Sequence, residues 1–189
     1  MLRPAIILVL LGATFGSLFD WLHVKTGAIA YAKPTSLGIA WWVPLLYSTA
    51  ALAIGLSHPM ADRLLGRVER VAHTRARLVF GFVAFCAIWF ATGALPFSSA
   101  IVAAMLAPVS LAIWFALDRT WQGLLLASST AVFGFAFEAL LSRLGLFRHI
   151  HPDVLGIAIW LPTIYVAASV GIGNLGRALT KWARPGVST

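Results

Sequence analysis

The sequence predicts an all-α integral membrane protein with six transmembrane helices. Its composition, its six apolar runs and an internal repeat lead to this fold class. The chain has 189 residues, of which 60% are hydrophobic and 11% are charged, and its mean hydropathy is +0.90. A soluble domain of this size cannot bury so much apolar surface. We therefore expect residues 1–180 to form a single six-helix transmembrane domain and residues 181–189 to form a short basic cytoplasmic tail.

One part of the chain occurs twice, displaced by 118 residues. Residues 13–55 and 131–173 share 17 identical residues in 43 aligned positions. The agreement is densest toward the end of each copy, where both carry the pattern Trp-x-Pro-x-x-Tyr. A shared apolar composition explains a few identities, but not a run in constant register. We interpret the repeat as a duplicated helical hairpin, a feature of several membrane folds.

Six apolar runs have about the length needed to cross the hydrocarbon core of a bilayer as helices. They cover residues 4–22, 36–57, 78–94, 100–117, 122–141 and 156–174. The first run could also be a signal peptide, but its counterpart in the repeat lies deep within the chain, so we expect it to remain as the first span. Pro44 and Pro162 fall inside the second and sixth runs, where each is expected to kink its helix.

The charges predict how these spans are oriented. Six spans place both termini on one side of the membrane, and ten of the 14 lysines and arginines fall on that side. The positive-inside rule makes this side cytoplasmic, in the inner membrane of a bacterium or the endoplasmic reticulum of a eukaryote. Spans 1–2 and 5–6 then form a parallel repeat about an axis normal to the membrane. Orientation explains the net charge of +8 better than binding of nucleic acid does.

The two Trp-x-Pro-x-x-Tyr units are the leading candidates for a lipid site. Their equivalent residues are Trp42 with Trp160, Pro44 with Pro162, and Tyr47 with Tyr165. Aromatic rings with one hydroxyl on each helix suit a lipid that has an apolar body and a small polar head. Packing is the alternative, in which tryptophan anchors the interface and proline only bends the helix.

Two acids, Asp20 and Glu138, are also equivalent in the repeat and lie near the outer ends of their spans. An acid at the bilayer centre costs roughly 3 kcal/mol and much less near the interface. Pairing with Lys25 or Arg143, or reaching to the surface, is one interpretation. Binding of a lipid head group, or action as a proton site, is the other, and we include Glu138 in the predicted lipid site.

The sequence shows no catalytic or metal-binding signature. His149, His151 and Asp153 share one loop, but without further ligands they do not predict a metal site, and no cofactor is expected. The single cysteine, Cys86, lies in an apolar run and excludes an internal disulfide.

Four stretches follow one another in an order and spacing that resemble a known family. They are Ala40-Trp-Trp-Val-Pro44 followed by Ile54-Gly-Leu and Asp62-Arg, then Leu117-Asp-Arg-Thr-Trp-Gln-Gly123, Trp160-Leu-Pro162 and Gly173-Asn-Leu-Gly-Arg177. They resemble the Insig proteins, the sterol sensors of the endoplasmic reticulum, over roughly residues 36–66 and 105–180. The resemblance implies six transmembrane helices, no catalysis, a sterol or other lipid bound within the membrane, and membrane-bound protein partners.

The resemblance also assigns a role to the end of the fourth span. In the family, the aspartate that matches Asp118 belongs to the surface that engages partner proteins, so Asp118 and its neighbour Arg119 are predicted to bind a partner. Alternatively, the two residues only cap and anchor the end of a helix. Small residues in the last span, such as Gly171 and Gly173, allow close helix packing and therefore a homo-oligomer.

Three functional hypotheses follow from these residues. The leading one is an Insig-like protein that binds a sterol or another neutral lipid in an intramembrane cavity and regulates membrane partners. The second is an intramembrane enzyme that acts on a lipid or isoprenoid, with Asp20 and Glu138 as acid and base. The third, a transporter, is disfavoured because the charged residues cluster at the ends of the spans.

Overall fold

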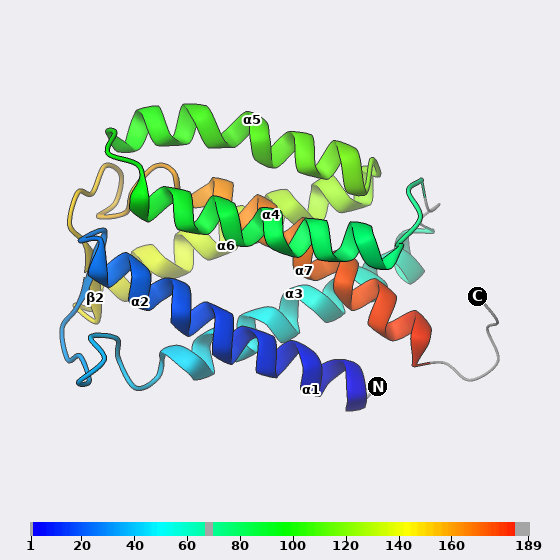
Figure 1. Ribbon diagram of the computed structural model, residues 1–189, viewed down its shortest axis with the longest axis horizontal. Helices are drawn as coiled ribbons and strands as arrows, with labels where there is room; N and C mark the ends of the chain where they lie inside the picture. Colours follow the sequence, from blue (N-terminus) through cyan, green and yellow to red (C-terminus); the bar gives the residue numbers. More distant parts are fainter. Residues whose placement is uncertain (1, 67–69, 184–189) are drawn as a thin grey trace.

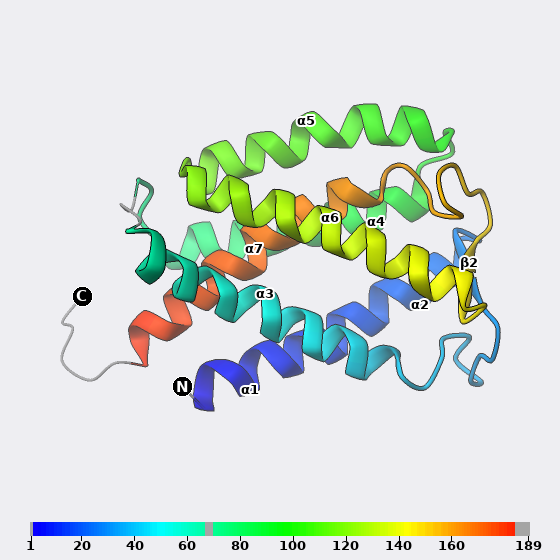
Figure 2. The same ribbon diagram turned by 180° about the vertical axis from the view of Figure 1, so that it is seen from behind.

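The structure, a computed structural model, describes residues 2–66 and 70–183 and is mostly helical (Figures 1 and 2). The helices are α1 (Leu2–Leu11), the π-helical turn η1 (Gly12–Gly16), α2 (Ser17–Lys25), α3 (Val43–Leu65), α4 (Arg75–Ala94), α5 (Ser99–Leu117), α6 (Trp121–Arg143) and α7 (Leu161–Trp182). Two short strands, β1 (Ile29–Tyr31) and β2 (Phe147–His149), pair at one end of the bundle.

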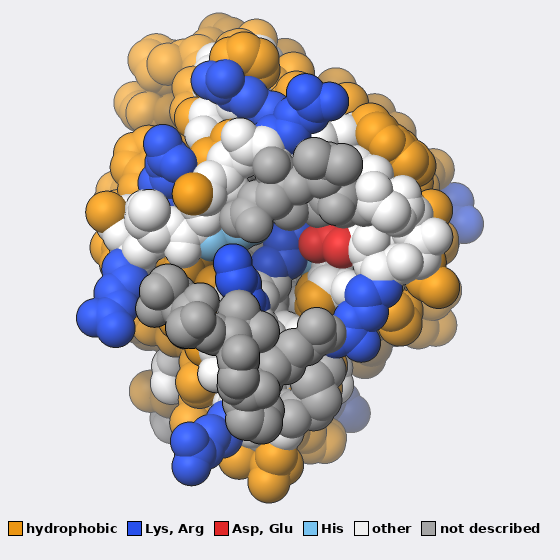
Figure 3. Space-filling view, turned by 90° about the vertical axis from the view of Figure 1, so that its right-hand side faces the viewer, with side chains coloured by type: hydrophobic (Ala, Val, Ile, Leu, Met, Phe, Trp, Pro, Cys, Tyr) orange, Lys and Arg blue, Asp and Glu red, His pale blue; other side chains and the backbone are white. Residues whose placement is uncertain are grey.

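Four helical segments are long and apolar enough to cross a membrane. They are Leu2–Lys25, which joins α1, η1 and α2, together with α4, α5 and α6. The outer flanks of the molecule are covered with hydrophobic side chains, while Lys and Arg side chains surround the end that Figure 3 shows. The prediction of a helical membrane protein therefore agrees with the structure.

The remaining long helices, α3 and α7, have 23 and 22 residues but are more polar. The polarity of α7 has a structural reason, because this helix packs against α3, α4, α5 and α6 and has 14 buried residues (Figure 1). A helix that is surrounded by protein does not need an apolar surface toward lipid.

Glycines bring α3 and α7 into close contact. A Cβ atom on Gly176 would lie 1.9 Å from the carbonyl oxygen of Gly55, so the backbones touch where the helices cross. Near this crossing, Gly173 makes room for the ring of His58, whose Nε2 lies 3.0 Å from the hydroxyl of Ser169. The two helices are therefore closely packed where they cross.

The strands β1 and β2 close one end of the bundle. They pair antiparallel, with Ala30 opposite Arg148 at the centre and Tyr31 opposite Phe147. Ala30 and Arg148 are 118 residues apart, the same displacement that relates the two copies of the sequence repeat. The loop after α2 and the loop after α6 therefore meet at equivalent positions.

The kinks expected at Pro44 and Pro162 were wrong. Each proline lies in the first turn of its helix, α3 or α7, where the missing N–H group would have no partner within the helix. Both helices consequently begin several residues later than predicted and continue further. Lys181 and Trp182 of the predicted tail belong to α7, and residues 184–189 of that tail lie outside the described residues.

Candidate functional site

A cavity of about 840 Å³ lies inside the bundle. The first helical segment, α3, α4, α6 and α7 form its walls, and the two strands lie at one end. Most of the lining is apolar, whereas two acidic side chains and their phenol and imidazole partners form two hydrogen-bonded clusters at the strand end. Cavities of this size hold one small organic ligand. The arrangement suits a ligand with an apolar body and one small polar end.

Two phenols hold Asp20 in the first turn of α2. Tyr47 donates a hydrogen bond to Oδ1 at 2.9 Å, and Tyr31 donates one to Oδ2. Gly16 lies one helical turn before Asp20, on the same face. A Cβ atom on Gly16 would lie 2.3 Å from Tyr47 Cβ, so glycine is needed for the tyrosine to pack there. In this Asp20 cluster (Gly16, Asp20, Tyr31 and Tyr47) the acid is 3% exposed.

The same kind of contact holds Glu138 on α6. Tyr165 donates a hydrogen bond to Oε1 at 2.5 Å, and His149 Nε2 lies 3.3 Å from Oε2. Gly134 lies one turn before Glu138, and a Cβ atom there would lie 2.4 Å from the Tyr165 ring. In this Glu138 cluster (Gly134, Glu138, His149 and Tyr165) the side chain of the acid is 17% exposed. Glu138 is therefore the more accessible of the two carboxyl groups.

Tyr31 of β1 acts only as a hydrogen-bond donor toward Asp20. Burial, with a further contribution from the nearby Asp20 carboxyl, raises the pKa of Tyr31 well above its usual value. Its phenol therefore stays protonated and donates to the acid.

Trp160 lies between two histidines at the strand end of the cavity. Its ring centroid is 5.6 Å from that of His23 and 5.5 Å from that of His149. Trp42, its equivalent in the repeat, is less buried and makes an edge contact with Tyr31 at 5.5 Å. The two tryptophans therefore occupy different surroundings at the same end of the site.

The structure brings five of the seven predicted lipid-site residues to the cavity: Trp42, Tyr47, Glu138, Trp160 and Tyr165. Pro44 and Pro162 do not line it, and instead begin the helices that carry the two tyrosines. The ion pairs considered with Lys25 and Arg143 are replaced by the phenol and imidazole contacts described above.

Sequence reasoning missed Tyr31 as a partner of Asp20 and His149 as a partner of Glu138. A signal for both was present, because Tyr31 and His149 are 118 residues apart, like the two acids. His149 was considered only as a metal ligand, and its actual neighbour is a carboxylate.

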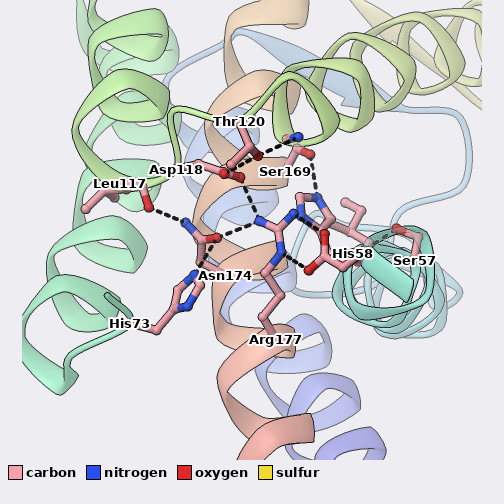
Figure 4. A network of polar contacts seen from close by, with 12 residues as sticks. Ser57, His58, His73, Leu117, Asp118, Thr120, Ser169, Asn174 and Arg177 are labelled. Carbon is pink, nitrogen blue, oxygen red and sulfur yellow. Dashed lines mark hydrogen bonds and ion pairs between the residues drawn. The ribbon is translucent and has the colours of Figure 1, made fainter. Parts of the chain in front are cut away.

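A second group of polar side chains lies toward the other end of α3 and α7 (Figure 4). Arg177 on α7 binds Asp62 of α3 with two hydrogen bonds, of 2.7 and 2.8 Å. Its Nη1 also lies 2.7 Å from Oδ2 of Asp118 and 2.8 Å from Oδ1 of Asn174. A buried arginine satisfied in this way ties α3, α7 and the turn between α5 and α6 together.

The two residues predicted to bind a partner differ in exposure. Asp118 is fully buried and accepts a hydrogen bond of 2.5 Å from the Thr120 hydroxyl, in addition to its contact with Arg177. Arg119 is exposed, has a φ of 59°, and places its guanidinium carbon 4.3 Å from the ring centroid of Phe115. Only Arg119 can touch a partner directly in this conformation.

Comparison with known proteins identifies the family. The sequence profile of the family described as insulin-induced protein (INSIG) matches residues 3–180. Insulin-induced gene 1 protein of Danio rerio is 28% identical over 183 residues, covering 95% of this chain and 73% of the relative. Insulin-induced gene 2 protein of Xenopus tropicalis is 29% identical over 188 residues, covering 97% of this chain and 86% of the relative.

Solved structures agree with this assignment. The mycobacterial Insig homologue MvINS from Mycobacterium vanbaalenii is similar to this chain with a TM-score of 0.84 and 27% sequence identity, covering 99% of this chain and 98% of that one. A cross-linked MvINS trimer matches with the same values. The family profile extends over almost the whole chain, including the two clusters around the acids. The chain is therefore a membrane protein of the Insig family.

Proposed function

We propose that this protein binds a sterol or another neutral lipid in its intramembrane cavity and acts as a lipid sensor through membrane partners. The single observation that carries the proposal is the position of two acid–tyrosine clusters at one end of an otherwise apolar cavity. The apolar walls suit the hydrocarbon body of a lipid. A neutral head that donates hydrogen bonds can approach the carboxyl groups, whereas a phosphate would bring like charge toward them.

The residues have different roles in this proposal. Glu138, Tyr47 and Tyr165 contact the polar head, and the rings of Trp42 and Trp160 border it. Pro44 and Pro162 act indirectly, by starting α3 and α7 where their tyrosines reach the acids.

We also propose that α3 and α7 cross the membrane, which gives six spans. At 1.5 Å per residue a helix of 22 residues is about 33 Å long, enough for the hydrocarbon core. The register of β1 and β2 and the matched contacts of Asp20 and Glu138 support a parallel duplication of the hairpins in spans 1–2 and 5–6.

The basic end of the molecule is proposed to be cytoplasmic, together with both termini. Among the residues that the structure describes, its exposed lysines and arginines are Arg3, Arg63, Arg70, Arg75, Arg77, Arg119 and Lys181. The positive-inside rule supports this orientation, in a bacterial inner membrane or in the endoplasmic reticulum.

Partners are proposed to lie in the same membrane. Arg119 would contact a partner protein directly, and buried Asp118 would act by holding the turn that presents it. The trimer of the mycobacterial homologue supports a homo-oligomer of this chain as well.

The intramembrane-enzyme alternative is not favoured by a specific observation. It would use Asp20 and Glu138 as acid and base, but both oxygens of each carboxyl group already lie within hydrogen-bond distance of a phenol or an imidazole. These contacts account for the two acids without a reaction.

Native mass spectrometry of the protein in mild detergent tests the proposal. We expect one sterol or other neutral lipid at fixed stoichiometry in the native protein and reduced retention after Tyr47→Phe combined with Tyr165→Phe. Thr14→Val is the matched control, because it removes a hydroxyl that lies outside the cavity lining. A non-selective lipid mixture that washes away, or equal retention in all variants, would contradict the assignment.

A further inference from the structure

The cavity is bordered by two gaps between helices, and the two gaps differ. The gap between α7 and the first helical segment is covered by α4, which contributes Phe82, Phe85 and Trp89 to the lining. At the gap between α3 and α6, several lining residues are exposed on the outer surface: Thr49, Ala53, Phe133, Ala136, Phe137 and Leu140. Residues that both line a cavity and lie on the surface form the rim of an opening.

A pair of phenylalanines shows that the difference comes from α4. Phe15 in η1 packs edge-on against Phe82 of α4, with ring centroids 5.0 Å apart. Phe133 on α6 is its equivalent, 118 residues later, and is 75% exposed. The same position of the repeat is therefore partly covered on one side, where Phe15 is 37% exposed, and open on the other.

A second pair shows the same contrast on α3 and α7. Gly171 of α7 lies against the backbone of α4, since a Cβ atom there would be 2.9 Å from the carbonyl oxygen of Gly81. Ala53 on α3 is the equivalent of Gly171 and is exposed. Of the two related gaps, α4 thus packs over one, and the other faces outward.

We infer that the gap between α3 and α6 is the lateral route by which a lipid passes between the bilayer and the cavity. This inference rests on the proposed lipid-binding function and names the side from which the site is loaded. The two helices lie side by side in Figure 2, and Gln122 of α6 donates a hydrogen bond of 3.4 Å to the carbonyl of Leu65 at one end of the gap.

The chemistry of the rim fits a hydrocarbon chain. Its residues are small or apolar, and Thr49 satisfies its own hydroxyl by bonding to carbonyls of its helix. A chain that crosses this rim therefore meets no charge and desolvates no unpaired polar group. Glu138 lies on α6, one of the two helices that carry the rim, and is more exposed than Asp20, so the head of the incoming lipid reaches it first.

Exchange kinetics test the route. The protein is loaded with cholesterol or dioleoylglycerol, whichever native mass spectrometry finds retained, and exchange for the deuterated form from nanodiscs is followed over time. Ala136→Trp narrows the rim and is expected to slow exchange about tenfold, with a smaller change in equilibrium occupancy, which is measured on the same samples. Phe133→Ala widens it and is expected to accelerate exchange. Ser128→Trp is the control, on an exposed part of α6 outside the cavity lining.

The outcomes separate this inference from the function on which it rests. Wild-type exchange in Ala136→Trp with normal occupancy, or equal slowing in Ser128→Trp, would overturn the route and leave the lipid site standing. A changed oligomer mass in Ala136→Trp would also overturn the route, because a helix of another subunit would then occupy the rim. If native mass spectrometry finds no sterol or other neutral lipid retained, the lipid site itself is refuted and the route with it.

Discussion

The Asp20 cluster and the Glu138 cluster are built from the same parts in different surroundings. Each has a glycine that seats a tyrosine ring and an acid one turn later that accepts its hydrogen bond. The third partner differs, being a phenol from β1 in one case and an imidazole from β2 in the other. Asp20 is buried on α2, which packs against α4, whereas Glu138 lies on the helix that borders the open gap.

From the repeat alone, both clusters would be expected to stabilise the fold and to bind the lipid head. Their different burial separates these two roles. A buried acid with two phenol donors joins α2, α3 and β1, so its main contribution is to stability. A partly exposed acid beside an opening can exchange a contact with a ligand. We therefore expect Asp20 and Tyr31 mainly to hold the fold and Glu138 to bind the lipid head, together with the hydroxyls of Tyr47 and Tyr165.

The largest expected effect comes from removing each acid. Asp20→Leu leaves the Tyr31 and Tyr47 hydroxyls buried without an acceptor, which costs about 2–6 kcal/mol of unfolding free energy at roughly 1–3 kcal/mol for each group. Glu138→Leu is expected to cost less stability and to lose more lipid. Unfolding by titration with SDS in mixed micelles and retention by native mass spectrometry measure the two quantities.

The conservative variants sharpen that contrast. Asp20→Asn keeps one acceptor oxygen and is expected to lose about half as much stability as Asp20→Leu. If Glu138→Leu destabilises the protein as much as Asp20→Leu and retains as much lipid, the division of tasks is wrong.

A smaller effect is expected at the glycines beneath the tyrosines. Gly16→Ala and Gly134→Ala each place a methyl group within about 2.5 Å of a tyrosine ring that then has to move, so we expect a cost of about 1–3 kcal/mol from overpacking. Similar costs at the two positions would support the shared architecture of the clusters. Gly145→Ala is a poor control because its φ is 69°, whereas Ser128→Gly measures the helix propensity of glycine at an exposed site of α6. A large loss of unfolding free energy at only one of the two glycines would show that the two glycine–tyrosine contacts are not equivalent.

Some of this organisation was predictable from the sequence. Apolar runs predicted the four strongest spans, because hydropathy depends only on local composition. The repeat predicted that the two acids and the two tyrosines would be equivalent, and five of the seven expected lipid-site residues line the cavity. The starts of α3 and α7 were misplaced because an apolar run with a proline is compatible both with a kinked helix and with a loop followed by a first-turn proline.

Other contacts depend on long-range packing that leaves no local pattern. Tyr31 and His149 reach the acids only because two three-residue strands pair across the bundle. Asp118 looked like a surface residue at a helix end, and its burial depends on Arg177, 59 residues further along the chain. The opening between α3 and α6 depends on where α4 packs, and the repeat does not include α4.

The smallest expected effect is at the third partner of each acid. Tyr31→Phe and His149→Phe each remove one hydrogen bond to a carboxyl group, which is worth about 1 kcal/mol, or somewhat more where the acceptor is charged. The loss at Tyr31 should appear mainly as lower stability, because the Asp20 carboxyl it leaves is buried from water. The loss at His149 should appear mainly as faster lipid exchange, because Glu138 is then less firmly oriented beside the opening. Unfolding titrations and lipid-exchange rates are measured on both variants. If both residues have a purely structural role, the two variants exchange lipid at the same rate.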